Sequence, residues 1–192
     1  MQESVSHQTQ SRAIPFDAAK LDRLMEQAGI DVLVATSKHN VQYLLDAERT
    51  IFFDYMDAIG VSRYLPVFVY LKGAPEKAGY FGTPLEAHQR AVTPLWVPEV
   101  QTKSMSSIDP ILRAAELIRK SGAPMKRIGV EMAFLPMDSG KALADALPGS
   151  EIKDALFMLE RLRAVKSPAE LAKLKKASER RRFTCFGSSQ WL

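Results

Sequence analysis

The side chains that could bind a metal ion are few and widely spaced in this sequence. A protein metal site brings several His, Asp, Glu or Cys side chains together, and usually two of them stand close in the sequence. The three histidines, His7, His39 and His88, form no such pair. Each is therefore interpreted as a surface or locally hydrogen-bonded histidine, and the sequence predicts no metal-ligating residue.

Nucleophilic and acid–base chemistry find little more support. The single cysteine, Cys185, has no histidine or acid close to it, although a catalytic cysteine needs a base and an orienting group. Solvated loop acids are commoner than catalytic ones, and glycine-rich phosphate-binding patterns are absent, so we predict no catalytic residue. One acidic cluster could still supply paired carboxylates for acid–base work: Asp46, Glu48, Asp54 and Asp57.

An aromatic cluster lies among those acids. Phe52, Phe53 and Tyr55 occur in residues 47–60, a stretch without clean periodicity that we interpret as a long loop. If the loop is exposed, the rings form an apolar patch of the kind that marks a contact surface. The alternative is that they fold back as a small satellite core. Both interpretations stay open.

The positive charge is concentrated near one end of the chain. Nine Lys or Arg and two Glu lie within residues 161–182, a net charge of +7. Because the whole chain carries +4, the remainder carries −3 and is mildly acidic. Nucleic-acid binding would need a basic patch on the folded surface, whereas charges along one helix are typical of a solvated face. We therefore expect no nucleic-acid partner.

Composition and length indicate one ordinary globular domain. At 192 residues the chain can bury a sizeable core. A single cysteine forms no internal disulfide, so nothing indicates secretion. Residues 1–12 lack the apolar core of a signal peptide, and no apolar run approaches the ~18 residues of a membrane span. We expect a cytoplasmic location and no membrane partner.

Helix-type and strand-type patterns alternate along the chain. Helices are expected to begin at Asp17, Asn40 and Thr83, and to cover residues 109–121, 138–147 and 155–165. Strands are expected over 30–35, 63–71, 77–81, 95–100, 127–132 and 151–154. Pro66 suggests an edge strand or a bulge. The alternation predicts an α/β domain of three layers, a mixed sheet of about five or six strands flanked by helices.

A strong helix start follows the last of these elements. Ser167 is a good N-cap, Pro168 takes the first helical position, and Glu170 completes a capping box three residues after the cap. Leu171 and Leu174 then recur at helical spacing. The pattern predicts a second helix that leaves the domain after a short break.

Three segments in this order together resemble the N-terminal domain of the creatinase, prolidase and aminopeptidase P family. Residues 21–34 (LDRLMEQAGIDVLV), followed by 40–44 (NVQYL), are similar to its opening. Residues 127–131 (RIGVE) are similar to a later strand, and 161–170 (RLRAVKSPAE) to the connection into the catalytic domain. The resemblance extends over residues 17–178.

The resemblance implies a mixed sheet flanked by helices, with ribonuclease-H-like layering. The family's hydrolytic centre, in which two Asp, one His and two Glu hold two divalent metal ions, lies in a pita-bread domain that would begin after Ser178. Catalytic residues, and the divalent Mn, Co or Zn they bind, are therefore expected only in that further domain. The implied partners are this catalytic domain and a second subunit. Phe52, Phe53 and Tyr55 become the candidate substrate-pocket or interface residues.

We therefore expect four segments: a disordered leader (1–14), the creatinase/prolidase N-terminal-like domain (15–165), a connector helix (166–179), and a tail (180–192) that departs from the family. The tail is interpreted as out-of-frame or expression-derived residues after a truncation. The predicted function is that of the non-catalytic N-terminal domain of an Xaa-Pro peptidase or creatinase-like metallohydrolase, inactive alone, which helps the enzyme to dimerise and shapes its substrate pocket. The alternative is a free-standing interaction or dimerisation module without a hydrolase role.

Overall fold

The computed structural model describes residues 13–46, 64–122 and 126–186. Its strands are β1 (Val32–Ala35), β2 (Val67–Leu71), β3 (Gly79–Gly82), β4 (Glu99–Thr102), β5 (Arg127–Val130) and β6 (Glu151–Asp154). Its α-helices are α1 (Ala18–Ala28), α2 (Lys38–Leu45), α4 (Ala87–Val92), α5 (Ile108–Lys120), α6 (Met137–Ala146), α7 (Leu156–Ala164) and α8 (Pro168–Phe186). Two 3-10 helices, η1 (Pro75–Lys77) and η2 (Pro84–Glu86), precede and follow β3.

The described strands form one mixed sheet in the order β4-β3-β2-β1-β5-β6. Strand β2 runs antiparallel to both of its neighbours, β1 and β3, and every other pair is parallel. The predicted hairpin and the predicted mixed sheet are confirmed. Because all strands except β2 run in the same direction, their carboxyl ends meet at one edge of the sheet, called the carboxyl edge below.

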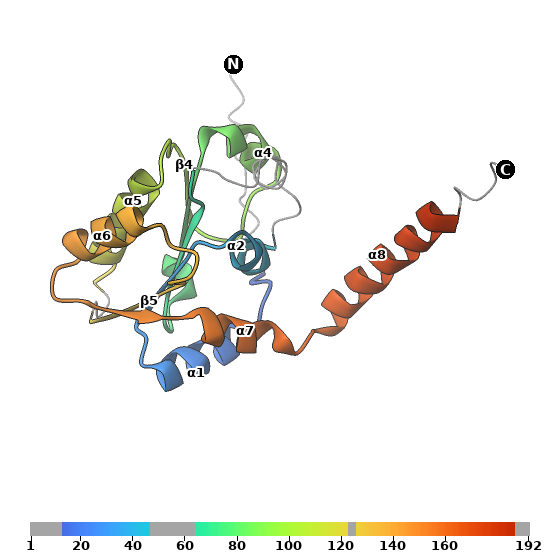
Figure 1. The fold of residues 1–192 in the computed structure, drawn as a ribbon, viewed down its shortest axis with the longest axis horizontal. Coiled ribbons are helices and arrows are strands. Elements are labelled where there is room, and N and C mark those ends of the chain that lie inside the picture. The colour runs from blue at the N-terminus through green and yellow to red at the C-terminus, as the bar shows by residue number, and fades with distance from the viewer. Residues whose placement is uncertain (1–12, 47–63, 123–125, 187–192) are drawn as a thin grey trace, which may run out of the picture.

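Each face of the sheet is covered by helices, which makes three layers (Figure 1). In β1, Leu33 and Ala35 point to the face covered by α1, α2 and α7, while Val32 and Val34 point to the face covered by α5 and α6. This alternation follows from the two-residue period of a strand. All four residues are fully buried, as expected for an interior strand with helices on both sides.

Local signals define the ends of α1 as the sequence predicts. The carboxylate of Asp17 accepts a hydrogen bond from the Lys20 backbone N–H at 2.8 Å, which caps the helix start. Gly29 ends the helix in a left-handed conformation (φ 63°), where a residue without a Cβ is favoured. The apolar face between these caps, including Leu21 and Met25, is buried against the sheet.

Three details differ from the sequence-based expectations. Ser37, not Asn40, is the N-cap of α2, and its hydroxyl accepts the Asn40 N–H at 3.4 Å. Pro66 does not indicate an edge strand, because β2 lies inside the sheet and begins only at the residue after the proline. Strand β4 begins at Glu99, later than residues 95–100 suggested.

Helix α8 projects away from the three layers (Figure 1). It follows α7 after three residues and starts with the predicted capping box: the Ser167 N–H donates to the Glu170 carboxylate at 2.7 Å, and the Glu170 N–H donates to the Ser167 hydroxyl at 3.2 Å. The helix continues to Phe186. The boundary that we placed between connector and tail, at 179/180, therefore falls within one helix.

Candidate functional site

A fully buried acid, Glu131, lies directly after β5 at the carboxyl edge. One of its carboxylate oxygens, Oε2, accepts the backbone N–H groups of Thr36 at 2.7 Å and Ser37 at 2.9 Å. The other, Oε1, accepts the Ser37 hydroxyl at 2.6 Å and the Asn40 side-chain amide at 2.6 Å. Four donors therefore surround the carboxyl group, which is the arrangement that an ionised carboxylate needs when it is removed from water.

The topology of the sheet explains why these groups meet. Strands β1 and β5 are parallel neighbours, so the residues that follow them, Thr36 and Glu131, lie side by side. Only two residues, Thr36 and the N-cap Ser37, separate β1 from α2, and the backbone N–H groups of both donate to the carboxylate. A negative charge at a helix N-terminus is also favoured by the helix dipole. The Glu131 side chain thus joins the end of β5 to the start of α2.

Asn40 extends this cluster to α7. Its Nδ2 donates to Glu131, and its Oδ1 accepts a hydrogen bond from Nη1 of Arg163 at 2.7 Å. Only one orientation of the amide satisfies both partners. The Arg163 guanidinium also stands 5.9 Å from the centre of the Tyr43 ring, within the range of a cation–π contact. Glu131, Asn40 and Arg163, with Thr36 and Ser37, are called the Glu131 network below.

His39 lies beside the network in the first turn of α2. Its Nε2 is 3.5 Å from the Ser37 hydroxyl, and its ring meets that of Phe134 edge to face, with 5.4 Å between centroids. Burial lowers the pKa of His39, the nearby Arg163 lowers it further, and Glu131 opposes both effects. The lowered pKa favours the neutral imidazole. His39 is thus a locally hydrogen-bonded histidine, one of the two interpretations that the sequence offers.

The network is suited to holding three elements together rather than to catalysis. The four donors around Glu131 and both ends of the Asn40 amide are used within the protein, and Glu131 and Asn40 are fully buried. The Thr36 hydroxyl is buried without a hydrogen-bond partner among the described residues. Within the residues that the structure describes, no group of three His, Cys, Asp or Glu side chains could hold a metal ion. The described residues therefore do not fit the two-metal centre that the resemblance places in a further domain. Nor is any described helix long and apolar enough to cross a bilayer.

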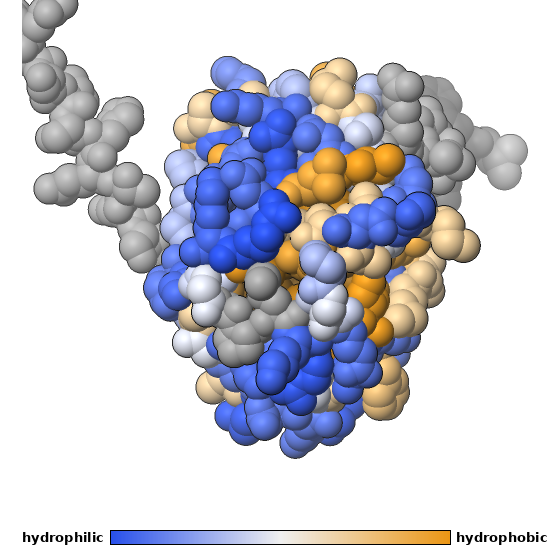
Figure 2. Space-filling view, turned by 90° about the vertical axis from the view of Figure 1, so that its left-hand side faces the viewer, coloured by the Kyte–Doolittle hydropathy of each residue, from blue (hydrophilic) through white to orange (hydrophobic). Residues whose placement is uncertain are grey.

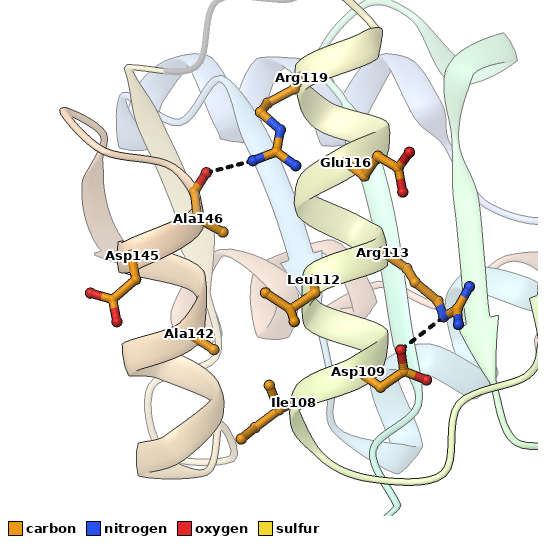
Figure 3. A pocket seen from close by; sticks show the side chains of 9 residues that line it. All are labelled: Ile108, Asp109, Leu112, Arg113, Glu116, Arg119, Ala142, Asp145 and Ala146. Atoms are coloured by element: carbon orange, nitrogen blue, oxygen red, sulfur yellow. Dashed lines mark hydrogen bonds and ion pairs between the residues drawn. The ribbon is translucent and has the colours of Figure 1, made fainter.

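A shallow groove of about 730 Å³ lies on the opposite face of the molecule, between α5 and α6. Apolar groups of Ile108, Leu112, Ala142 and Ala146 face it, and charged side chains flank them (Figure 3). Figure 2 shows this side of the molecule, with hydrophobic residues visible between hydrophilic ones. Ile108 and Leu112 are 38% and 46% exposed, so the groove offers an apolar contact area.

The charged groups around this groove are already paired. Arg113 donates to Asp109 at 3.0 Å, and Arg119 donates to the backbone carbonyl of Ala146 at 3.1 Å (Figure 3). Lys120 and Lys141 pair with the remaining two lining acids, Glu116 and Asp145. The groove therefore directs no unpartnered charge at a ligand, in contrast to an enzyme active site.

The residues singled out from the sequence do not gather at one place. Phe52, Phe53 and Tyr55 lie outside the described residues, as do His7 and the acids Glu48, Asp54 and Asp57. Asp46 ends α2 in a left-handed conformation and forms an ion pair with Lys173, with 2.7 Å between Oδ1 and Nζ. His88 belongs to α4 and Cys185 to α8, on different parts of the fold.

Sequence reasoning missed the Glu131 network although its key residues were in view. Asn40, Glu131 and Arg163 each belong to one of the three segments that carry the family resemblance, and the structure joins all three by hydrogen bonds. The available signal was a polar residue at an element end in each segment. The partners are 91 and 123 residues apart, so no local pattern could pair them.

Comparison with solved structures places the fold. An Xaa-Pro dipeptidase from Bacillus anthracis is 20% identical with a TM-score of 0.58, over 83% of this chain and 39% of that one. A prolidase from Pyrococcus furiosus is 16% identical with a TM-score of 0.59, over 85% and 42%. An N-terminal domain of a cytoplasmic peptidase from Mycobacterium tuberculosis is 21% identical with a TM-score of 0.54, over 76% and 97%. At these identities the likeness establishes the fold alone.

The chain thus spans about two-fifths of the Bacillus anthracis dipeptidase but nearly the whole of the separate Mycobacterium tuberculosis domain. A comparison with curated protein sequences finds no significant match. The model of the creatinase/prolidase N-terminal domain matches residues 18–165, well over half of the sequence. This chain therefore belongs to the creatinase/prolidase N-terminal domain family.

Proposed function

We propose that this chain acts as the non-catalytic N-terminal domain of a metal-dependent Xaa-Pro peptidase or creatinase-like hydrolase. One observation carries the proposal: the chain matches 97% of a separately solved N-terminal domain but only 39% of a dipeptidase that contains the same fold. The family match ends at residue 165, directly before the break that leads into α8. Helix α8 is then the connector to a catalytic domain.

In this proposal the domain contributes to subunit contacts and to the shape of the substrate pocket. The reaction itself, with its Mn, Co or Zn ions, belongs to the catalytic domain. The absence of a possible metal-binding group among the described residues is compatible with this division of roles. Phe52, Phe53 and Tyr55 remain the candidates for the pocket or the subunit interface.

The proposal is tested by assaying the purified chain with Xaa-Pro dipeptides and with creatine, in the presence of Mn²⁺, Co²⁺ or Zn²⁺. A full-length Xaa-Pro dipeptidase serves as the positive control. We expect no turnover by this chain, and metal-dependent turnover would contradict its non-catalytic role. Genomic sequence downstream of residue 192, read in all three frames, should encode a pita-bread domain with its acidic and histidine ligands.

A free-standing interaction module is the second candidate, and the α5/α6 groove favours it. The groove presents exposed Ile108 and Leu112 between paired charges, as protein contact surfaces often do. Light scattering across a range of concentrations separates this reading: self-association that is abolished by Leu112→Glu would support it. A concentration-independent monomer would argue against any strong self-contact.

A further inference from the structure

We infer that α2 acts as a bracket that fixes the direction in which α8 leaves the domain. Both ends of α2 reach the C-terminal helices. Asn40, in its first turn, binds Arg163 at the end of α7, and Asp46, its C-cap, binds Lys173 in α8. The device operates within this chain, whatever follows α8, and so goes beyond the proposed function.

The first contact secures the point from which α8 departs. Arg163 lies in the last turn of α7, and Asn40 ties it to the buried Glu131 carboxylate. The neighbouring Leu162 is buried, and its carbonyl accepts a hydrogen bond from Nζ of Lys20 in α1 at 3.0 Å. The end of α7 is therefore fastened to both α1 and α2.

The link between α7 and α8 leaves little freedom. Only Val165, Lys166 and Ser167 separate the two helices. The Lys166 side chain donates back to the Arg163 carbonyl, and the capping box defines where α8 begins. Few backbone torsions remain that could redirect α8, so one further contact can select among its directions.

The second contact provides that selection. Nζ of Lys173 lies 2.7 Å from Oδ1 of Asp46, whose backbone is itself fixed by hydrogen bonds to the carbonyls of Gln42 and Tyr43. Apolar packing cannot replace this contact, because Leu171 and Leu174 are 54% and 55% exposed. The Asp46 and Lys173 side chains are also largely exposed, and exposed pairs are weak. The short link therefore limits the directions open to α8, and the Asp46–Lys173 pair favours one of them, a preference that a single substitution can remove.

The test is a pulsed EPR distance measurement on the full chain. In a Cys185→Ser background, spin labels are attached at Ser178→Cys in α8 and Ala144→Cys in α6, both exposed positions. Otherwise unsubstituted protein is expected to give one narrow distance distribution. Lys173→Glu, which places a second acid beside Asp46, should shift and broaden it. Exchanging the two charges, with Asp46→Lys in the same chain, should restore the narrow distribution.

Arg163→Leu should alter the distance distribution more than Lys173→Glu, because it removes the hydrogen bond that holds the end of α7, from which α8 departs. The matched controls are Lys175→Glu in α8 and Arg161→Leu in α7, both of which should leave it unchanged. A broad distribution in the unsubstituted chain would overturn the inference. So would a Lys173→Glu distribution equal to that of Lys175→Glu, a comparison that remains decisive if Arg163→Leu fails to fold.

Discussion

The parallel strands β1 and β5 are joined by an acidic side chain at each end. One acid pairs with a cation, and the other is held by hydrogen bonds from uncharged donors. At the amino end, Asp31 pairs with Arg127: Nη2 donates at 2.7 Å, Nε at 3.2 Å and the backbone N–H at 3.1 Å. At the carboxyl end, Glu131 receives four donors without a direct cation. Asp31 is 10% exposed and its partner Arg127 is 40% exposed, whereas Glu131 is fully buried.

The difference predicts different energetics. A partly exposed ion pair is screened by water and salt and contributes little net free energy. A buried carboxylate depends on its hydrogen bonds, because each unsatisfied donor or acceptor left behind in the interior costs a desolvation penalty. The amino end should therefore tolerate substitution and the carboxyl end should not. Substitutions of Glu131, Asp31 and His39 test this contrast.

Glu131→Gln should have the largest effect. The new amide NH2 group faces either the Thr36 and Ser37 N–H groups, which can only donate, or the Asn40 amide nitrogen together with the Ser37 hydroxyl, which can turn to accept. In either orientation at least one donor meets another donor. We expect the free energy of unfolding to fall by about 3 kcal/mol, measured by urea denaturation. Glu116→Gln, at an exposed helical ion pair, is the control and should leave the free energy of unfolding almost unchanged. Equal losses would refute the contrast.

Asp31→Asn should cost about 1 kcal/mol, since solvent screens its partner. The Arg127 guanidinium lowers the pKa of Asp31 below its usual 3.8. As the pH falls, Asp31 is therefore protonated in the unfolded chain before it is protonated in the folded chain. The stabilisation by the Asp31–Arg127 ion pair is present above pH 3.8 and is lost below it. Denaturation of both proteins between neutral and acidic pH, at low and high salt, checks this. A loss that salt does not reduce would contradict the screened ion pair.

His39→Gln should have the smallest effect, and only in acid. Burial and Arg163 lower the pKa of His39 in the folded chain, so the unfolded chain binds the proton more readily. The unsubstituted protein should therefore lose stability as the pH falls below about 6.5, the ordinary pKa of histidine. The variant should lack this pH-dependent loss. Thermal melts between pH 5 and pH 8 measure it. If the thermal stability of both proteins depends on pH in the same way, the pKa of His39 is not lowered in the folded chain.

Local sequence patterns were enough for the architecture. Continuous apolar residues in 30–35 predicted the interior strand β1, and Asp17 with Gly29 predicted both ends of α1, because capping acts over a few residues. Ser167 and Glu170 likewise predicted the start of α8. The mixed sheet then followed from alternation and one hairpin.

Local sequence patterns could not predict the Glu131 network, because its side chains bind partners far apart in the sequence. Asn40 resembled an N-cap, yet Ser37 caps the helix and the Asn40 side chain is committed to Glu131 and Arg163. Sequence patterns place Arg163 among the solvated basic residues of 161–182 and Glu131 near the end of a strand. Each assignment needs the β1–β5 pairing, which sequence spacing alone does not specify.

Asn40 couples the buried Glu131 carboxylate to α7. A double-mutant cycle measures this coupling by urea unfolding of the unsubstituted chain, Glu131→Gln, Arg163→Leu and the double variant. Because Glu131 and Arg163 both bind Asn40, we expect a coupling free energy of about 0.5–3 kcal/mol. Losses that add to within about 0.3 kcal/mol would contradict it.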